Sequence, residues 1–524
     1  MKLTVPHANA GAALLCMLFV LSGSLFLDRP GLHSDELLFA GGIYPPAPPY
    51  GSARVFGRDF PLMVMSYCGT LKSLLWTPIF AAFGVTAVSV RFPALLIGAL
   101  SVWWFYRLLL ATLGTRIAVI GCALLATHST YLFTTRWDWG PVALQHALFT
   151  GGCLAFVHHW RSRSPWWAAA GGFAFGLGLW DKALFAWSIA AVVLAVTIAF
   201  PRQLWRSLSI AGIVFAIAGL VAGAYPLLRY NVRHNWETFR GNTEANTESV
   251  AYKFSVLRAT VDASVVGGPV IRPRHEGPER YPASSAEHAV DRLAKLFRYS
   301  RDNLHGWLLL GCLLMTPLWW RTPARRAVLF TLCFCAALWA QMVPLQYGGS
   351  SSHHTILLWP VALVAPAAVL GHVPGASWIT AALCVQSLGV TAVWYSELLR
   401  LGGVPAWTEA IGPAAASLRE HRGRVCVLDW GFFDNLRALG QGRYTMCVLE
   451  DPVQAERQRY VLHGIADPSA IFIRHTDGHE IDQGRAARTL DFAQQHGYVQ
   501  TERKLFEDAN GRATIETFRL TKLQ

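Results

Sequence analysis

The sequence predicts a multi-span α-helical membrane protein with a small C-terminal α/β domain. Of its 524 residues, 53% are hydrophobic and only 15% are charged, and the mean hydropathy is +0.33. A soluble chain of this length normally carries about 25% charged residues. Because so few charges cannot cover so many apolar side chains, a wholly soluble protein is excluded and much of the surface must face lipid.

The net charge of +13 belongs to the hydrophobic part of the chain. Residues 1–400 carry 30 Lys or Arg and 16 Asp or Glu, whereas residues 401–524 carry 15 and 16. Basic residues concentrated in apolar sequence indicate membrane topology and contact with anionic lipid. No nucleic-acid partner is needed to explain the charge.

Apolar runs long enough to cross the hydrocarbon layer recur along the first 400 residues. We expect about eleven spans, since each crossing takes roughly 20 apolar residues. The runs lie near residues 8–27, 87–106, 117–134, 141–157, 166–180, 183–200, 208–228, 305–320, 327–344, 355–371 and 377–396. The first run is too long for an ordinary signal peptide and no cleavage site follows it, so we expect a retained helix.

The charges of the short loops predict which end of the bundle faces the cytoplasm. With the N-terminus inside, the cytoplasmic connections contain basic residues only, and all 32 acidic residues fall on the outer side. The basic residues are Lys2, Arg107, Arg116, Arg161, Arg163, Arg202, Arg206, Arg321, Arg325 and Arg326. We therefore expect a transmembrane module, residues 1–399, with outer loops at 28–86 and 229–303, and an extracytoplasmic domain at 400–524.

The last 125 residues are expected to form the α/β domain. Apolar runs at Arg424–Asp429, Tyr444–Leu449 and Ala470–Arg474 alternate with helix-like stretches, a pattern typical of a small α/β unit. Cys426 and Cys447 fall on adjacent predicted strands, so the sequence leaves a disulfide between them open.

Metal-ligand spacing occurs once, in the segment from His475 to Glu480. A polar turn around Gly478 is the simpler interpretation of that segment. Asp35, Glu36 and Asp138 offer carboxylates to a divalent ion, but nothing else in the sequence supports one. We expect no metal and no other cofactor.

Three clusters of ionisable residues lie in outer loops, where charge near a membrane favours a functional role. The first is the segment from His33 to Glu36. Its adjacent carboxylates, Asp35 and Glu36, repel each other, which raises one pKa and suits a general base. The alternative is a helix N-cap at Ser34 or Asp35, with both acids complementing the helix dipole.

The second cluster contains Arg136 and Asp138, where the third span meets the fourth. Its alternative is an interfacial aromatic belt with a self-neutralised ion pair. The third cluster, Asp181 and Lys182, lies between spans five and six, and its alternative is a tight turn in which Lys182 neutralises Asp181. The shared depth of these clusters, on the side of the large loops, favours a site.

Five short motifs follow one another along the chain. They are Asp35-Glu36, Tyr67-x-Gly69-x-Leu71-Lys72, Ser89-Val90-Arg91-Phe92-Pro93, Arg136-x-Asp138-x-Gly140-Pro141 and Gly178-Leu179-Trp180-Asp181-Lys182. In this order they resemble the GT-C superfamily of integral-membrane glycosyltransferases. Within it, residues 1–370 are similar to bacterial relatives of protein O-mannosyltransferase and of the lipid A aminoarabinose transferase.

The resemblance implies a catalytic base in the first loop and an active site flanked by the Arg-x-Asp motif. It also implies cations that meet a lipid phosphate in a late loop, where this chain has His353 and His354 before Pro360. The expected site residues are Asp35, Glu36 and Asp138 as catalytic groups, Lys182, Arg136, Arg229, His353 and His354 at the donor phosphate, and Tyr67 and Lys72 as acceptor-binding or positioning groups.

The chemistry expected of this topology is sugar transfer from a lipid. Outside the inner membrane of a bacterium there is no expected nucleotide-sugar pool, whereas a polyprenyl-phosphate sugar has already crossed. Its phosphate leaves without a strong general acid, so the protein needs a base for the acceptor hydroxyl and cations for the phosphate. We expect an inverting hexosyl- or pentosyltransferase that acts on a hydroxyl of a lipid, glycan or protein. The alternatives are a lipid-linked sugar flippase or transporter, a polysaccharide ligase, and a membrane scaffold.

Overall fold

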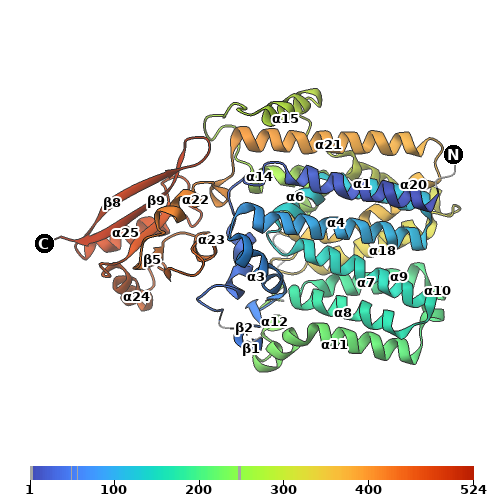
Figure 1. Ribbon diagram of the computed structural model, residues 1–524, viewed down its shortest axis with the longest axis horizontal. Coiled ribbons are helices and arrows are strands. Elements are labelled where there is room, and N and C mark those ends of the chain that lie inside the picture. The colour runs from blue at the N-terminus through green and yellow to red at the C-terminus, as the bar shows by residue number, and fades with distance from the viewer. Residues whose placement is uncertain (1–3, 49, 56, 243, 246–249, 524) are drawn as a thin grey trace.

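The computed structural model describes the chain except for residues 1–3, 49, 56, 243, 246–249 and 524. Four of these positions or ranges belong to the two predicted outer loops and lie outside the described residues. Figure 1 shows a bundle of helices with a small sheet domain beyond one end of it. The N-terminus lies at the opposite end of the bundle from the sheet. The predicted fold class, a helical membrane module followed by a small α/β domain, is confirmed.

The helices of the bundle coincide with the predicted apolar runs, each run matching one helix or a series of shorter consecutive ones. They are α1 (Val5–Ser24), α4 (Ala87–Thr112), α5 (Thr115–Ala126), α6 (Ser129–Trp137), α7 (Val142–Ser162), α8 (Pro165–Asp181), α9 (Phe185–Ala199), α11 (Ile210–Arg233), α16 (Leu304–Leu314), α18 (Arg325–Met342), α20 (Val364–Gly371) and α21 (Ala376–Leu401). Short segments between them are α10 (Pro201–Ser207), α17 (Thr316–Trp319), α19 (Ser352–Thr355), η3 (Ile356–Leu358) and η4 (Val361–Leu363).

A count of spans based on the length and composition of the described helices is lower than the estimate from the sequence. By these criteria four described helices, α1, α4, α11 and α21, can cross a membrane, and up to seven spans result if each bent helix pair is one span. The sequence estimate is higher because it also included α8 and α16, which have only 17 and 11 residues. It also included α7, which carries internal His and Gln residues. The total of about eleven stays a prediction.

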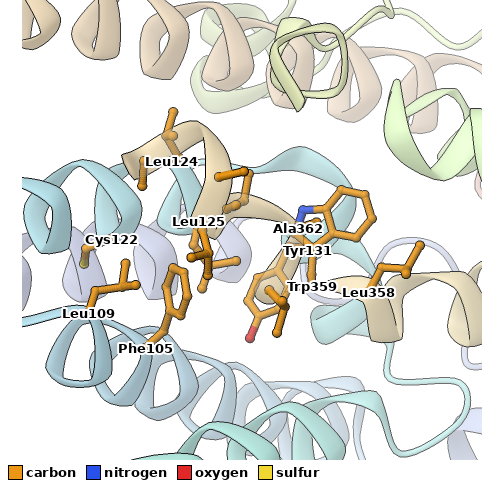
Figure 2. Packing of buried hydrophobic residues seen from close by; sticks show 14 of the residues in the cluster. Phe105, Leu109, Cys122, Leu124, Leu125, Tyr131, Leu358, Trp359 and Ala362 are labelled. Carbon is orange, nitrogen blue, oxygen red and sulfur yellow. The ribbon is translucent and has the colours of Figure 1, made fainter. Parts of the chain in front are cut away.

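The largest apolar cluster fills the space between the bundle helices. Figure 2 shows Phe105 and Leu109 of α4, Leu124 and Leu125 of α5, and Trp359 beyond η3 packed together. None of these side chains is more than 2% exposed. Because lipid is as apolar as these residues, close packing rather than exclusion from water holds such helices together. The cluster therefore fastens the late, broken segment of the chain against the early helices.

Helices α8 and α11 approach each other through glycines. A Cβ at Gly172 would lie 2.0 Å from the carbonyl oxygen of Ala216, and a Cβ at Gly219 would lie 2.1 Å from that of Ala169. Both oxygens are backbone atoms, so only separation of the two helices could make room. The contact fixes the C-terminal end of α8, which carries Asp181 and Lys182.

We expect Gly172→Ala to destabilise the protein because the added methyl must push α11 away from α8. Overpacking of this kind costs about 1–3 kcal/mol. The measurement is thermal unfolding in detergent, with Gly311→Ala as control, since a Cβ at Gly311 of α16 meets no atom within 4 Å. Equal melting temperatures for the two variants would show that the α8–α11 contact is not tight.

The segments between the bundle helices at the sheet end are short and irregular. The first loop forms α2 (Ser34–Leu37), η1 (Leu38–Gly42), β1 (Ser52–Val55), β2 (Arg58–Pro61), β3 (Met63–Met65), β4 (Cys68–Gly69) and α3 (Leu71–Phe83). The second forms α12 (Glu237–Arg240), α13 (Val250–Val261), η2 (Ser264–Val266), α14 (Gly267–Val270) and α15 (Ser285–Leu296).

The C-terminal domain is a five-stranded sheet with helices. Its elements are η5 (Pro405–Trp407), α22 (Ile411–Ser417), β5 (Arg424–Val427), α23 (Phe433–Leu439), β6 (Thr445–Val448), α24 (Ala455–Ile465), β7 (Ile471–His475), α25 (Arg485–Gln495), β8 (Tyr498–Glu507) and β9 (Ala513–Lys522). The strand order is β6-β5-β7-β9-β8. The three predicted apolar runs form β5, β6 and β7, which are mutually parallel. Cys426 and Cys447 are direct neighbours on β5 and β6 and form a disulfide.

Candidate functional site

The first acidic cluster forms the short helix α2, and its cap differs from the one considered in the sequence. His33, rather than Ser34 or Asp35, is the N-cap, and its ring accepts a hydrogen bond from the backbone N–H of Asp35 at 3.1 Å. The Glu36 carboxylate accepts one from the backbone N–H of His33 at 2.9 Å. This capping box turns the two adjacent carboxylates in different directions.

Glu36 points into the protein, away from the solvent. Its two carboxylate oxygens each accept a hydrogen bond of 2.7 Å from the Arg91 guanidinium, and both side chains are 0% exposed. Arg91 also donates to the backbone carbonyls of Leu27, Pro30 and Gly31. A bidentate pair of this kind fixes geometry. Glu36 therefore anchors α2 to the start of α4, and the structure does not bring it to the cavity as a catalytic group.

Asp35 lines a cavity of about 150 Å³ between the first loop and the bundle. Its side chain is 41% exposed. Burial of the surrounding segment and the negative charge of Asp434 raise the pKa of Asp35 to about 6, against the opposing effect of Lys182. A carboxylate with such a pKa is ionised near neutral pH and is a stronger base than an ordinary Asp.

The cavity gathers five of the ten predicted site residues from four separate parts of the chain. They are Asp35, Tyr67, Lys72, Lys182 and His353. Asp181, which belongs to the third predicted cluster but was given no role at the site, also lines it.

Lys182 follows α8 directly and is held by the first loop. It forms an isolated antiparallel bridge with Cys68, and the N–H of Ala183 donates to the Tyr67 carbonyl at 2.9 Å. A Cβ at Gly69 would lie 2.0 Å from the carbonyl oxygen of Trp180, so this approach requires the glycine of the second motif. These contacts place Lys182 opposite the first loop.

The ammonium group of Lys182 forms no direct ion pair among the described residues, although the residue is only 5% exposed and its charge acts on the Asp35 carboxyl. Its neighbour Asp181 instead accepts a hydrogen bond from Gln145 at 2.9 Å. No direct ion pair therefore joins Lys182 to Asp181, although the charges of the two neighbours still act on each other. A Cβ at Gly140 would lie 3.1 Å from Lys182 Nζ and 3.1 Å from His353 Cδ2, so both side chains approach this glycine.

Asp138 and Lys72 form a buried ion pair at the edge of the cavity. Lys72 Nζ lies 2.7 Å from Asp138 Oδ2, and both side chains are at most 4% exposed. The other Asp138 oxygen accepts from the N–H of Ala143 in the first turn of α7, at 2.9 Å. Asp138 ends α6 with φ 45°, a conformation that Asp adopts more readily than most residues. Of this pair, only Lys72 lines the cavity.

Arg136 lies away from the cavity, contrary to its predicted contact with the donor phosphate. The guanidinium is fully buried and donates to the backbone carbonyls of Gly23, Leu25, Phe26 and Arg29 and to the Tyr395 hydroxyl. These carbonyls belong to the end of α1 and the chain that follows it. Arg136 therefore ties α6 to α1 and α21, a role in folding.

We expect Arg136→Gln to lower stability and to leave the KM for donor lipid unchanged in the protein that still folds. Loss of the guanidinium leaves buried carbonyls without donors, which costs roughly 1–3 kcal/mol for each group left unpaired. Thermal unfolding and donor titration of the same preparation check both statements. Arg422→Gln, a substitution at an exposed arginine of the C-terminal domain, is the control. A strongly raised KM for the Arg136 variant would return this residue to the phosphate site.

The remaining predicted residues divide between the cavity and its surroundings. His353 lines the cavity and its Nδ1 lies 2.8 Å from the Ser351 hydroxyl. His354 is 8% exposed and its ring packs edge-on against Trp187. Arg229 lies on α11, outside the residues that line the cavity.

Three contributing residues received no role from the sequence. Asp181 and Gln145 line or support the cavity, and Arg91 fixes Glu36. Arg91 is a charged residue within one apolar run, and Gln145 with its neighbour His146 interrupts another, which is the signal that could have found Arg91 and Gln145. Within the described part of the chain, no group of three or more His, Cys, Asp and Glu side chains is arranged to hold a metal ion. His475 instead lies 2.6 Å from Asp429.

Comparisons with known proteins agree with this architecture. Residues 72–225 match the model of the dolichyl-phosphate-mannose-protein mannosyltransferase family. The sequence matches none of the curated proteins. Among solved structures, ArnT from Cupriavidus metallidurans bound to undecaprenyl phosphate is similar, with a TM-score of 0.59, 13% identity and 97% of both chains covered. Its apo form gives 0.58 with the same identity and coverage.

A third solved structure extends the comparison beyond bacteria. The Archaeoglobus fulgidus oligosaccharyltransferase in its apo form has a TM-score of 0.50 and 12% identity, covering 99% of this chain and 74% of that one. Together these matches define the class: the chain has the GT-C fold of integral-membrane glycosyltransferases. The resemblance stated from the five motifs is thereby confirmed.

Proposed function

We propose that this protein is an inverting glycosyltransferase that moves a sugar from a polyprenyl-phosphate lipid to a hydroxyl acceptor at the outer face of a bacterial inner membrane. One observation carries the proposal: a single cavity is lined by a carboxylate with a raised pKa, Asp35, and by a buried cation that forms no direct ion pair with a described residue, Lys182. Sugar transfer from a phosphate needs one group of each kind.

Asp35 is the base in this reaction. The proton of the acceptor hydroxyl passes to the Asp35 carboxylate while the acceptor oxygen bonds to the anomeric carbon. The bond from that carbon to the phosphate oxygen breaks on the opposite face, and its electron pair leaves with the phosphate. A single displacement of this kind inverts the anomeric configuration. A positioned general base contributes about 10²–10⁴-fold to such a step.

Lys182 binds the phosphate of the donor and stabilises the charge that develops on it. A buried ammonium without a direct ion pair is costly, and an anion that enters the cavity removes this cost. The interaction gains strength as the leaving phosphate becomes more negative, which is the condition for catalysis. Lys72 lies in the same cavity but is already neutralised by Asp138. His353 and Tyr67 then remain to orient the sugar and the acceptor.

The chemistry of the donor lipid is supported by the relatives. The ArnT structure is bound to undecaprenyl phosphate, and the family that matches residues 72–225 is named for a dolichyl-phosphate sugar. Both lipids carry a phosphate on a long isoprenoid chain. The cavity lies between the first loop and the helical bundle, and helix residues such as Lys72 and Asp181 line it, so the lipid tail can remain among the helices. The basic residues in the loops at the other end of the bundle support an extracytoplasmic position for this end.

The experiment that tests the proposal is profiling of lipid-linked sugars in a deletion strain beside its parent. We expect one polyprenyl-phosphate sugar to accumulate on the outer leaflet and one glycosylated product to disappear. The accumulated lipid identifies the sugar. A flippase would instead leave the donor on the cytoplasmic leaflet, and unchanged lipids together with an unchanged set of glycosylated products would refute the proposal.

A further inference from the structure

The C-terminal domain contacts the segment that carries Asp35. Helix α23 of this domain lies beside the first loop, at the junction of the bundle and the sheet (Figure 1). Asn435 donates to the carbonyl of Leu32 at 3.0 Å, and Arg437 donates to the carbonyl of Pro46 at 3.3 Å. Ala438 packs into the apolar cluster of the first loop, which includes Leu37.

A second set of contacts holds the residues just before Asp35. The ring of His33 stacks on Trp407, with 4.4 Å between the ring centroids, and lies 5.3 Å from that of Trp430. The N–H of Gly31 donates to the Trp407 carbonyl at 2.8 Å. Both tryptophans belong to the chain after residue 400. The cap of α2 is therefore built partly from the C-terminal domain.

Asp434 is a charged group of that domain that acts on the base. It accepts a hydrogen bond from the Ser34 hydroxyl at 3.3 Å and forms an ion pair with Arg437, one turn later on α23. Its side chain is 18% exposed, and Asp434 does not line the cavity. Ser34 precedes Asp35 directly, so the Asp434 carboxylate faces the first turn of α2 from outside the reaction space.

We propose that Asp434 is a positioning residue through which the C-terminal domain orients and tunes Asp35. The inference rests on the proposed function, because it assigns a role to Asp434 only if Asp35 is the base. A second negative charge beside α2 disfavours ionisation of Asp35 and so makes the ionised base stronger. The hydrogen bond to Ser34 holds α2 in place while this charge acts.

The other groups that face Asp35 do not supply this negative charge. His33 lies 4.0 Å from the Asp35 carboxylate, but burial and the charge of Arg91 lower the pKa of His33 to about 3, so it is neutral. Both oxygens of Glu36 bond Arg91, whereas Arg437 bonds only one oxygen of Asp434 and the other accepts from Ser34 next to Asp35. Tyr67 and Cys68, from the turn before α3, are also neutral because burial raises the pKa of each. Lys182 acts in the opposite sense.

The test compares the pH dependence of kcat/KM for sugar transfer by the full-length protein and its Asp434→Asn variant. Asn keeps the shape and can still accept from Ser34, but it removes the charge. We expect the acid limb to move to lower pH by about half a unit, so that kcat/KM at pH values below the limb rises roughly threefold relative to its own plateau. Asp491→Asn, at an exposed carboxylate of α25, should leave the limb in place.

Two further variants separate failure of this inference from misfolding and from failure of the proposed function. If loss of the ion pair prevents Asp434→Asn from folding, the double variant Asp434→Asn, Arg437→Gln removes both charges and is expected to show the same shift. Asp35→Asn is measured in the same assay. Turnover by Asp35→Asn would refute the proposed function. An inactive Asp35→Asn together with an unshifted limb in the Asp434 variants would overturn this inference alone.

Discussion

Asp35→Asn is expected to abolish sugar transfer while leaving expression and folding intact. The amide keeps the size and much of the hydrogen bonding of the carboxylate but cannot take the proton of the acceptor. The expected loss in kcat is about 10²–10⁴-fold. Because the Asp35 side chain is 41% exposed and makes no ion pair shorter than 4.0 Å with a described residue, its replacement removes little packing.

The assay compares initial rates of transfer from a lipid-linked donor by the purified protein and the variant. Asp28→Asn is the matched control, since Asp28 lies in the same loop with a side chain that is 76% exposed. Normal turnover by the Asp28 variant and loss in the Asp35 variant supports a base at position 35. Near-normal turnover by Asp35→Asn removes Asp35 from that role.

The same account predicts the pH dependence of the wild-type enzyme. The base works in its ionised form, and the pKa of Asp35 is raised to about 6 by burial and by Asp434. Activity is therefore expected to fall as the pH drops through about 6, about two units above the range of an ordinary Asp. A rate that stays constant down to pH 5 would contradict the identification of Asp35 as the base.

Lys182→Met is expected to raise the KM for donor lipid strongly, with little loss of stability. The ammonium group forms no direct ion pair in the described structure, so its removal leaves no carboxylate unpaired. Truncating one partner of a buried, charge-assisted contact typically costs about 2–5 kcal/mol of binding, which is at least a thirtyfold change in KM. Lys182→Arg should recover part of the affinity, since it keeps the charge with a different shape.

The measurement for this prediction pairs donor titration with thermal unfolding. Lys504→Met, at an exposed lysine of the sheet, is the control and should match wild type in both. If Lys182 served only the fold, its replacement would lower the melting temperature and leave the donor KM unchanged. That pattern would exclude Lys182 as the phosphate ligand.

Much of the architecture could be predicted because it follows from local chemistry. Apolar runs predict helices wherever lipid is the solvent, and three short apolar runs after residue 400 predict the parallel strands. The prediction that Asp35 and Lys182 face one site also agrees with the geometry. Both residues follow apolar segments. Because a charge is costly to bury in hydrocarbon, the end of such a segment places it at the membrane boundary.

The pairing of the charges could not be predicted, because it depends on contacts between distant segments. Arg136 and Lys182 look alike in the sequence, each within two residues of an Asp at the end of an apolar run. In the structure the guanidinium of Arg136 donates hydrogen bonds to carbonyls more than 100 positions away in the sequence. Lys182, by contrast, forms no direct ion pair with a described residue. Glu36 and Asp35 are likewise adjacent, yet Arg91, 55 positions further on, separates their roles.

The number of spans depends on the lengths and bends of the helices, and the total of about eleven stays a prediction. Sequence hydropathy counts every apolar run, but α5 and α6 bend by 58° at their junction, and other helices are too short to cross alone. Bends and lengths of this kind follow from packing against neighbouring helices.

The most direct test of the central claim is transfer in vesicles by the purified protein, with donor lipid extracted from the deletion strain. The quantity to measure is free polyprenyl phosphate released for each acceptor glycosylated. The account predicts one phosphate lipid per product for wild type, with inversion at the anomeric carbon, and none for Asp35→Asn. Donor lipid that crosses the vesicle membrane with its sugar–phosphate bond intact, and without product, would contradict it.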